Sequence, residues 1–414
     1  MAIDFTLTAQ QRELQRACRR FAKEVLGEAK RAEQLATPEE RFRATRPTYE
    51  AMVAAGYLRK CIPAPAGGDN AGLMDMAILA EEFYSVNASV TLTMLGTVLG
   101  LLPILLGGTP DQCQRLLAPF LKPNGAPLAG FCFSEPGGSA NAASPPPGEG
   151  VRTTAKRDGD NWVINGRKKW VSSATGWNRE GADVLCVVCR TDPAAAPDAA
   201  MSVIAVEGPV RGLVFERAID TIGHRAHLVP EFSLQNVTSP HHNLLGQQGS
   251  GLALTAGAFT ATAALVGVFG VALMRTAFEF ALHFAQTEKR GGVHAIIEHQ
   301  AVGYALADAK TTIEAARYLS WRACHALDTQ SPAAEELAVQ AKIFGSEAAV
   351  RMITDLMRVV GIESYDHEGP LAGLLQDALA LPIFDGGNMG VRRRQLHTML
   401  KRGDYDPLTA SGAA

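Results

Sequence analysis

The spacing of apolar residues predicts that the N-terminal part of the chain, residues 1–125, is helical. Apolar side chains recur there at intervals of three or four residues, which places them on one face of a helix. Thr8 and Gln11 have the spacing of a capping box that would begin the first helix. Further helical patterns cover residues 47–57, 74–85 and 110–121.

Residues 88–107 are almost wholly apolar and approach the length of a membrane-spanning helix. Pro103 and several glycines interrupt this stretch, and no basic anchors flank it. We therefore expect a pair of buried helices here and no membrane span. The N-terminus lacks a basic region followed by an apolar core, so no signal peptide is expected.

Between residues 126 and 245 the pattern changes to short runs typical of strands. Asn165-Gly166 separates two such runs and predicts a two-residue hairpin turn. Cys186 and Cys189 lie in another apolar run, and one C-x-x-C is only half of a zinc site, so a buried strand is expected there. Further strands are predicted at residues 184–189, 202–206, 213–216 and 231–237.

Helical spacing returns over residues 246–405 and predicts a four-helix bundle, followed by a disordered tail at 406–414. The chain as a whole predicts an α+β fold with an N-terminal helical domain, a middle β domain and a C-terminal bundle. The four long segments of the bundle are residues 251–287, 296–328, 333–360 and 371–383.

Composition narrows the function classes. A length of 414 residues exceeds what one hydrophobic core usually serves. The formal net charge of −3 argues against a dedicated binder of nucleic acid or anionic membranes. Seven cysteines without regular spacing do not form a disulfide framework, which favours a reducing interior. We therefore expect a soluble, cytoplasmic protein.

Asp385 is the main candidate for a catalytic residue. It lies between an apolar stretch and a basic helix start, next to Gly386 and Gly387. One interpretation is that it caps the following helix, as Asp often does. The other is that it acts as a general base. Arg392 follows seven residues later, which is two helical turns, so its charge could face the carboxylate; Arg393 and Arg394 are expected to be solvated.

Two further segments have ligand-binding character. Residues 131–139 offer hydroxyls and glycine amides that suit a polar ligand edge or phosphates, although an ordinary turn has the same composition. Trp170 and Ser172 place an aromatic ring and a hydroxyl at the end of a predicted strand. His294 and His299 lack the spacing of a helical zinc motif, so no metal site is expected.

Together these segments resemble the acyl-CoA dehydrogenase superfamily of flavoproteins over nearly the whole chain. In that family the turn that matches Phe384-Asp385-Gly386 carries the base that removes the substrate α-proton. The resemblance therefore implies FAD as cofactor, a homotetramer, and Asp385 as the base. The other matching pieces are Ser134-Glu135-Pro136, Trp170-Val171-Ser172, Asn243-Leu244-Leu245-Gly246, Glu298-His299-Gln300, and Gly361 with Tyr365.

The resemblance also implies how FAD is held. Trp170 would pack on the isoalloxazine ring, and Ser172 would bond near its N5. Arg290 and Gln300 would reach the FAD of a neighbouring subunit. The full set of cofactor-binding residues implied in this way is Phe131, Ser134, Gly138, Ser139, Asn141, Trp170, Ser172, Arg290, His299, Gln300, Gly361, Gly386 and Gly387.

The departures from the family pattern concern the substrate. The first bundle helix reads Phe259-Thr260-Ala261-Thr262-Ala263, without the charged pair that helps dehydrogenases to hold CoA. The segment from Gly361 to Tyr365 also departs from the usual glycine-rich one, and the base is Asp instead of Glu. All three departures resemble the nitroalkane oxidase branch of the superfamily, in which a serine stands at the position of Thr262. The implied catalytic residues are Asp385, Arg392 and Thr262.

This branch implies oxidation of a small neutral nitroalkane by O2, giving an aldehyde or ketone, nitrite and hydrogen peroxide. No nucleic acid or membrane partner is implied. Two alternatives stay open at this point. One is an acyl-CoA dehydrogenase with a modified substrate pocket. The other is a flavin-binding protein that has kept the fold and lost catalysis.

Overall fold

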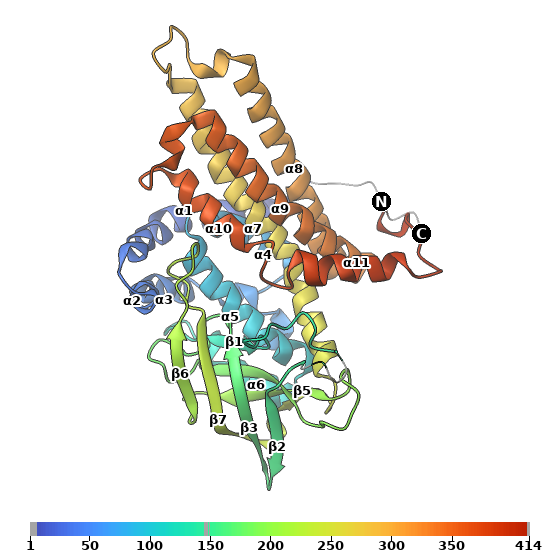
Figure 1. Ribbon diagram of the computed structural model, residues 1–414. Coiled ribbons are helices and arrows are strands. Elements are labelled where there is room, and N and C mark those ends of the chain that lie inside the picture. Colours follow the sequence, from blue (N-terminus) through green and yellow to red (C-terminus); the bar gives the residue numbers. More distant parts are fainter. Residues whose placement is uncertain (1–5, 145–147, 149, 412–414) are drawn as a thin grey trace.

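The computed structural model describes residues 6–144, 148 and 150–411, and it confirms the α+β fold. The sheet lies at one end of the molecule and the long bundle helices at the other, with N-terminal helices between them (Figure 1). Helix α7 (Gly251–Thr287) begins beside the sheet and runs through the bundle, so one helix joins the two parts (Figure 1).

The N-terminal helices follow the predicted pattern closely. The capping box before α1 forms as expected: Gln11 N donates to Thr8 Oγ1, and the Gln11 side chain accepts from Thr8 N. The helices of this part are α1 (Ala9–Glu24), α2 (Pro38–Ala44), α3 (Arg46–Ala54), α4 (Leu73–Tyr84), α5 (Ala88–Gly107) and α6 (Pro110–Leu117).

The expected pair of helices over residues 88–107 is wrong, because α5 is a single helix with Pro103 inside it. Pro103 lies close to the C-terminal end, where the missing N–H costs only one backbone hydrogen bond. By length and composition α5 and α7 could each cross a membrane, but 67% and 72% of their most apolar windows are buried inside this protein. Burial against protein accounts for their apolar composition.

The middle of the chain forms one sheet in the order β6-β7-β3-β2-β4-β5-β8, and β1 pairs in parallel with β4. Cys186 and Cys189 are buried on β4, as predicted, and burial raises the pKa of Cys189 to about 12. The strands are β1 (Ala129–Cys132), β2 (Thr154–Asp158), β3 (Asn161–Lys169), β4 (Val184–Arg190), β5 (Met201–Glu207), β6 (Leu213–Ala218), β7 (Pro230–Pro240) and β8 (Leu244–Leu245).

The predicted hairpin turn at Asn165-Gly166 is wrong. Both residues lie inside β3, where the pairing with β7 shifts register. Asn165 Nδ2 donates to Asn236 Oδ1 across the strands, and Asn165 Oδ1 accepts from Asn236 N. A side chain at Gly166 would meet Thr153 Oγ1 at 2.4 Å, so the glycine serves close packing. The turn of the hairpin lies at Gly159 instead, with φ +57°.

The C-terminal part contains α7, α8 (Gln300–Asp328), α9 (Ala334–Val360), α10 (Pro370–Ala380) and α11 (Arg393–Leu400). Helices α7 and α9 approach closely because Gly267 and Gly345 face each other: a side chain on Gly345 would lie 2.8 Å from the Gly267 Cα. In the expected tail, Thr409–Ser411 forms a short 3-10 turn, and residues 412–414 lie outside the described residues.

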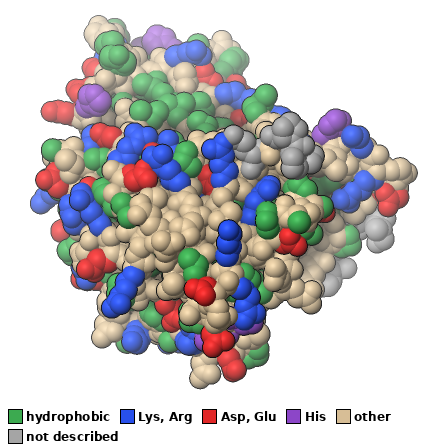
Figure 2. Space-filling model, turned by 60° about the horizontal axis from the view of Figure 1, so that its bottom comes forward, with side chains coloured by type: hydrophobic (Ala, Val, Ile, Leu, Met, Phe, Trp, Pro, Cys, Tyr) green, Lys and Arg blue, Asp and Glu red, His purple; other side chains and the backbone are tan. Residues whose placement is uncertain are grey.

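The face of the molecule in Figure 2 carries Lys and Arg side chains scattered among Asp and Glu side chains. Opposite charges are therefore mixed on this face, which is usual for a soluble domain surface.

Candidate active site

A tight turn between α10 and α11 presents Asp385. Asp385 and Gly386 adopt consecutive left-handed conformations, with φ of +53° and +71°. The π-helix η8 (Asn388–Arg392) follows at once and continues into α11. Left-handed backbone at a residue other than glycine is strained, and such residues cluster at functional sites. Asp385 caps neither η8 nor α11, whose N-cap positions are Gly387 and Arg392, so the capping interpretation is wrong.

The structure brings Asp385, Arg392 and Thr262 together. Thr262 Oγ1 donates to Asp385 Oδ1 at 2.8 Å, and Arg392 Nη2 donates to Asp385 Oδ2 at 3.1 Å. The Asp385 and Arg392 side chains are only 4% and 1% exposed. The contact does not come from two stacked helical turns, as the spacing suggested. It comes from the reversal of the chain at the glycines.

Arg392 also fixes the backbone around the carboxylate. Its Nε and Nη2 donate to the Asp385 carbonyl oxygen at 3.1 and 2.8 Å. Its Nη2 further donates to the Phe259 carbonyl oxygen of α7 at 2.9 Å. A single buried guanidinium therefore joins the turn to the first bundle helix, which holds the carboxylate in one orientation.

Apolar rings form one wall beside this site. The ring centroid of Phe259 lies 5.5 Å from that of Phe131 and 5.9 Å from that of Phe133. Phe131 and Phe133 are buried at the end of β1, so this contact joins the sheet to α7. The helix that carries Thr262 is therefore packed against the sheet by apolar rings.

The loop after β1 carries several predicted FAD residues. Ser134 Oγ and Ser139 Oγ lie 3.4 Å apart, and Gly138 has φ +84° with open space where a side chain would be. Glu135 anchors the loop, because its carboxylate accepts four hydrogen bonds, two of them from the backbone N–H groups of residues 152 and 153. The chain thus presents two hydroxyls from a loop that is fixed at its base.

Asn141, in the same loop, accepts from Arg394 Nη1 at 3.2 Å. Arg393 and Arg394 are both exposed to solvent, as expected, but each also has a polar partner in the protein. Arg394 binds the loop of the β domain, and Arg393 forms a two-pronged ion pair with Glu347. These contacts hold α11 against both neighbouring parts of the molecule.

Trp170 and Ser172 follow β3 in an unusual backbone. Trp170 has φ +65° and is 51% exposed, and Lys169 Nζ lies 5.3 Å from the centroid of its ring. Ser172 Oγ lies 3.0 Å from His227 Nε2, and His227 Nδ1 lies 3.0 Å from Thr93 Oγ1. Burial lowers the pKa of His227 to about 3, so the imidazole is neutral at physiological pH. Sequence reasoning missed His227, and no spacing signal marks it.

The remaining predicted residues lie at the far end of the bundle. Arg290 donates to the Val360 carbonyl oxygen at 2.6 Å and pairs with Glu363, which places it beside Gly361. His299 and Gln300 are exposed where α8 begins. About 25 helical residues separate Thr262 from the end of α7, which is roughly 40 Å at 1.5 Å per residue. The structure therefore does not bring this group to Asp385 of the same chain.

Gly386 and Gly387 serve the turn itself. A side chain on Gly386 would lie 3.1 Å from Arg392 Nε, and one on Gly387 would lie 2.9 Å from the Ile383 carbonyl oxygen. Gly386 therefore leaves room for Arg392, and Gly387 leaves room for the backbone that enters the turn. The structure gives them this role without reference to any ligand.

Lys342 and Asn388 were missed as residues of the site. Lys342 Nζ donates to the Leu381 carbonyl oxygen at 2.9 Å and to Asn388 Oδ1 at 2.8 Å, and both side chains are buried. A signal was present in the sequence: Lys342 stands one helical turn from Ala338 and Gly345 on the apolar face of α9. A lysine on a buried helix face needs hydrogen-bond partners, so its position in the sequence indicates a buried polar site.

Comparison with known proteins shows the family to which the chain belongs. Models of the acyl-CoA dehydrogenase N-terminal, middle and C-terminal domains match residues 8–123, 130–237 and 249–400. A nitroalkane oxidase of Podospora anserina is 42% identical over 425 aligned positions, which cover 98% of each chain. The chain belongs to the nitroalkane oxidase branch of the acyl-CoA dehydrogenase superfamily.

Solved structures of this branch agree in fold. The Podospora anserina nitroalkane oxidase structure superposes with a TM-score of 0.95 at 41% identity over the whole of both chains. A nitroalkane oxidase active-site variant crystallised with 1-nitrohexane gives a TM-score of 0.96 at 35% identity, again over both whole chains. Membership of the nitroalkane oxidase branch confirms the resemblance found in the sequence, and members of the branch are FAD-dependent flavoproteins.

Proposed function

We propose that this protein is an FAD-dependent oxidase that converts a neutral nitroalkane, O2 and water to an aldehyde or ketone, nitrite and hydrogen peroxide. The observation that carries the proposal is the buried carboxylate of Asp385, held by Arg392 and Thr262. A nitro group acidifies its α-carbon, so a carboxylate without bulk water around it can take the proton.

The Asp385 carboxylate has acceptor positions left for that proton. An ionised carboxylate offers about four acceptor positions. Within the described residues, its two oxygens accept only two hydrogen bonds, one from Thr262 and one from Arg392. Half of the acceptor capacity is therefore available to the substrate. Arg392 places a positive charge 3.1 Å from the carboxylate, in a site that is almost closed to solvent.

The residues around the site suit FAD. The exposed indole of Trp170 offers a face for a planar ring, and the convergent hydroxyls of Ser134 and Ser139 offer donors for its polar edge. The open backbone at Gly138 allows close approach of a bulky ligand. When bound, FAD supplies the redox chemistry: it takes the electron pair of the deprotonated substrate and passes it to O2.

A small substrate without CoA is favoured by the start of α7. Thr260 and Ala263 stand where dehydrogenases of the superfamily carry a charged pair, so this helix has no charge there to hold a CoA thioester. The crystallised relative with 1-nitrohexane supports an unbranched nitroalkane of moderate length as substrate class. Binding energy remote from the reacting carbon would then come from apolar contact, such as that of the Phe259 wall.

A homotetramer is part of the proposal. Arg290, His299, Gln300 and Gly361 lie too far from Asp385 to bind the same FAD within one chain. Large apolar side chains are exposed at that end of the bundle: Val293 is 79%, Ile362 82% and Tyr365 80% exposed. A neighbouring subunit would cover them and would bring its FAD to Arg290.

The test mixes purified, FAD-loaded protein with nitroethane or 1-nitropropane in air and measures nitrite and hydrogen peroxide. We expect both products in equal amounts. A protein with normal FAD content that forms no nitrite would refute the proposal. Bleaching of the flavin by an acyl-CoA without oxygen would favour the dehydrogenase alternative, and bleaching by neither substrate would favour loss of catalysis.

A further inference from the structure

Lys342 joins the two ends of the segment that carries Asp385. Its Nζ donates to the carbonyl oxygen of Leu381, just before the turn, and to the side chain of Asn388, just after it. The backbone N–H of Asn388 also donates to the Pro382 carbonyl oxygen, which closes the loop. A single side chain from α9 thus sets the span between the two ends of the turn.

The lysine is part of a larger frame on α9. Asn388 Nδ2 donates to Ser346 Oγ at 3.0 Å and to Glu347 Oε1 at 3.1 Å. Ser346 Oγ in turn donates to the Lys342 carbonyl oxygen at 2.6 Å, one turn earlier on the same helix. The turn is therefore attached to three nearby residues of α9, namely Lys342, Ser346 and Glu347. This attachment constrains the strained backbone at Asp385.

The charge of Lys342 is finely balanced. Burial lowers its pKa to about 7, while Asp385 and Glu347 act to raise the pKa and Arg392 acts to lower it. Glu347 is itself paired with Arg393. A neutral amine has two N–H groups, and Lys342 has two acceptors, so the neutral form satisfies its donors completely.

We propose that Lys342 is a positioning residue, which holds the Asp385 turn so that the unoccupied lone pairs of the carboxylate point at the substrate α-carbon. This inference rests on the proposed function, because it concerns the same proton transfer. Lys342 contacts neither Asp385 directly nor Arg392, and so acts through the backbone of the turn. A displacement of the base by about 1 Å is enough to slow proton transfer by about 100-fold.

The test separates proton abstraction from the reduction of the flavin that follows it. Nitroethane needs a base, whereas ethyl nitronate, its preformed anion, does not. Anaerobic reduction of the bound flavin is followed with each substrate in the wild-type protein and in Lys342→Met, which keeps the length of the side chain and removes its donors. We expect about a 100-fold slower reduction by nitroethane in the variant. Reduction by the nitronate is expected to stay at the wild-type rate.

Two further variants keep the test decisive. Lys342→Gln retains one donor and serves if Lys342→Met yields too little folded protein, as judged by flavin content and the urea midpoint. Lys310→Met, which removes an exposed lysine paired with Glu314 on α8, is the matched control and should behave like wild type. Equal slowing with both substrates would show a general structural role, and unchanged rates would show none; either result overturns the inference. A wild-type flavin that neither substrate reduces would refute the proposed function itself.

Discussion

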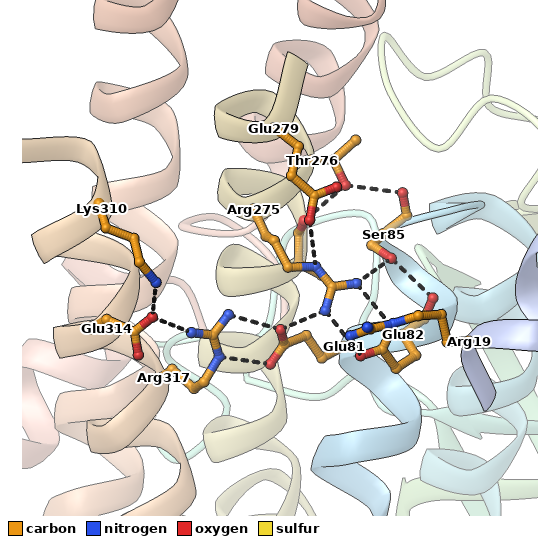
Figure 3. Close-up of polar contacts among 11 residues, drawn as sticks. Arg19, Glu81, Glu82, Ser85, Arg275, Thr276, Glu279, Lys310, Glu314 and Arg317 are labelled. Atoms are coloured by element: carbon orange, nitrogen blue, oxygen red, sulfur yellow. Dashed lines mark hydrogen bonds and ion pairs between the residues drawn. The ribbon is translucent and has the colours of Figure 1, made fainter. Parts of the chain in front are cut away.

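Two buried carboxylate clusters of this protein differ in how completely their charges are paired. One is the interdomain cluster of Glu81, Glu82, Arg275, Arg317 and Arg19, which joins α1 and α4 to the bundle helices α7 and α8 (Figure 3). The other is the site around Asp385. Both bury carboxylates among arginines, yet Asp385 leaves more acceptor capacity unused than either glutamate.

In the interdomain cluster Glu82 is fully paired, and Glu81 accepts three hydrogen bonds. Glu82 accepts four hydrogen bonds, two from Arg19 and two from Arg275. Burial by itself would raise the pKa of Glu82, but the hydrogen bonds from Arg19 and Arg275 outweigh it and leave the pKa below its ordinary value. A carboxylate in this state binds no further proton near neutral pH, so it can only hold the domains together.

Asp385 accepts two side-chain hydrogen bonds, half as many as Glu82. Arg392 donates most of its hydrogen bonds to backbone carbonyl oxygens. The guanidinium thus fixes the position of the base without filling its lone pairs. The comparison suggests a general rule: a buried carboxylate is structural when its acceptors are full, and available for chemistry when they are not.

The largest effect is expected when the base itself is removed. Asp385→Asn keeps the shape and the bond to Thr262 but cannot take a proton, so turnover of nitroethane should fall by about 1000-fold. Stopped-flow reduction of the bound flavin measures this loss. Ethyl nitronate should still reduce the variant. Full activity with nitroethane would remove Asp385 as the base.

Removal of one charge from the saturated cluster should affect stability instead. Glu82→Gln removes the charge of a buried carboxylate that pairs with Arg275, and we expect the free energy of unfolding to fall by about 3 kcal/mol. Urea unfolding measures the loss, and turnover per bound flavin should stay unchanged. Glu13→Gln, in an exposed pair with Arg16, is the control and should change neither quantity. Loss of turnover in Glu82→Gln without loss of stability would show that Glu82 serves catalysis and not the stability of the fold.

Thr262 provides an intermediate effect within the site. Thr262→Val removes the hydroxyl that donates to Asp385 and retains the shape, so the charge-assisted bond worth roughly 2 kcal/mol is lost. Steady-state kinetics with nitroethane should show turnover about 30-fold slower. Thr262→Ser keeps the donor and should retain activity; a slow Thr262→Ser variant would mean that packing of the methyl group matters more.

The smallest effect concerns pH. Because burial lowers the pKa of His227 to about 3, the unfolded chain binds a proton there more readily than the folded one between pH 6.5 and 3. Stability from this group is therefore lost as the pH falls through 6.5. Between pH 7.5 and 5.5 the wild type should lose about 1 kcal/mol more than His227→Gln in urea unfolding. Equal losses in both proteins would indicate that His227 is charged when folded.

Local patterns predicted much of this fold. Helical spacing located α1, α7 and α9, and the capping box at Thr8 formed as expected. The errors arose where long-range packing overrides local preference. Asn165-Gly166 lies inside a strand because β7 and Thr153 occupy the space of a turn, and the apolar stretch before Gly107 stays one helix because its whole length is buried.

For the candidate site, too, the sequence determined some features and the tertiary structure decided others. The sequence by itself determined which residues are present: an aspartate flanked by glycines, an arginine seven positions later, and a threonine on a helix without CoA-binding charges. Only the tertiary structure decided that Asp385 is a half-paired carboxylate and that Lys342 fixes its turn. The reason is physical. Residue types and spacing are local properties, whereas the hydrogen bonds that remain unfilled depend on side chains from α7 and α9, more than 40 positions away.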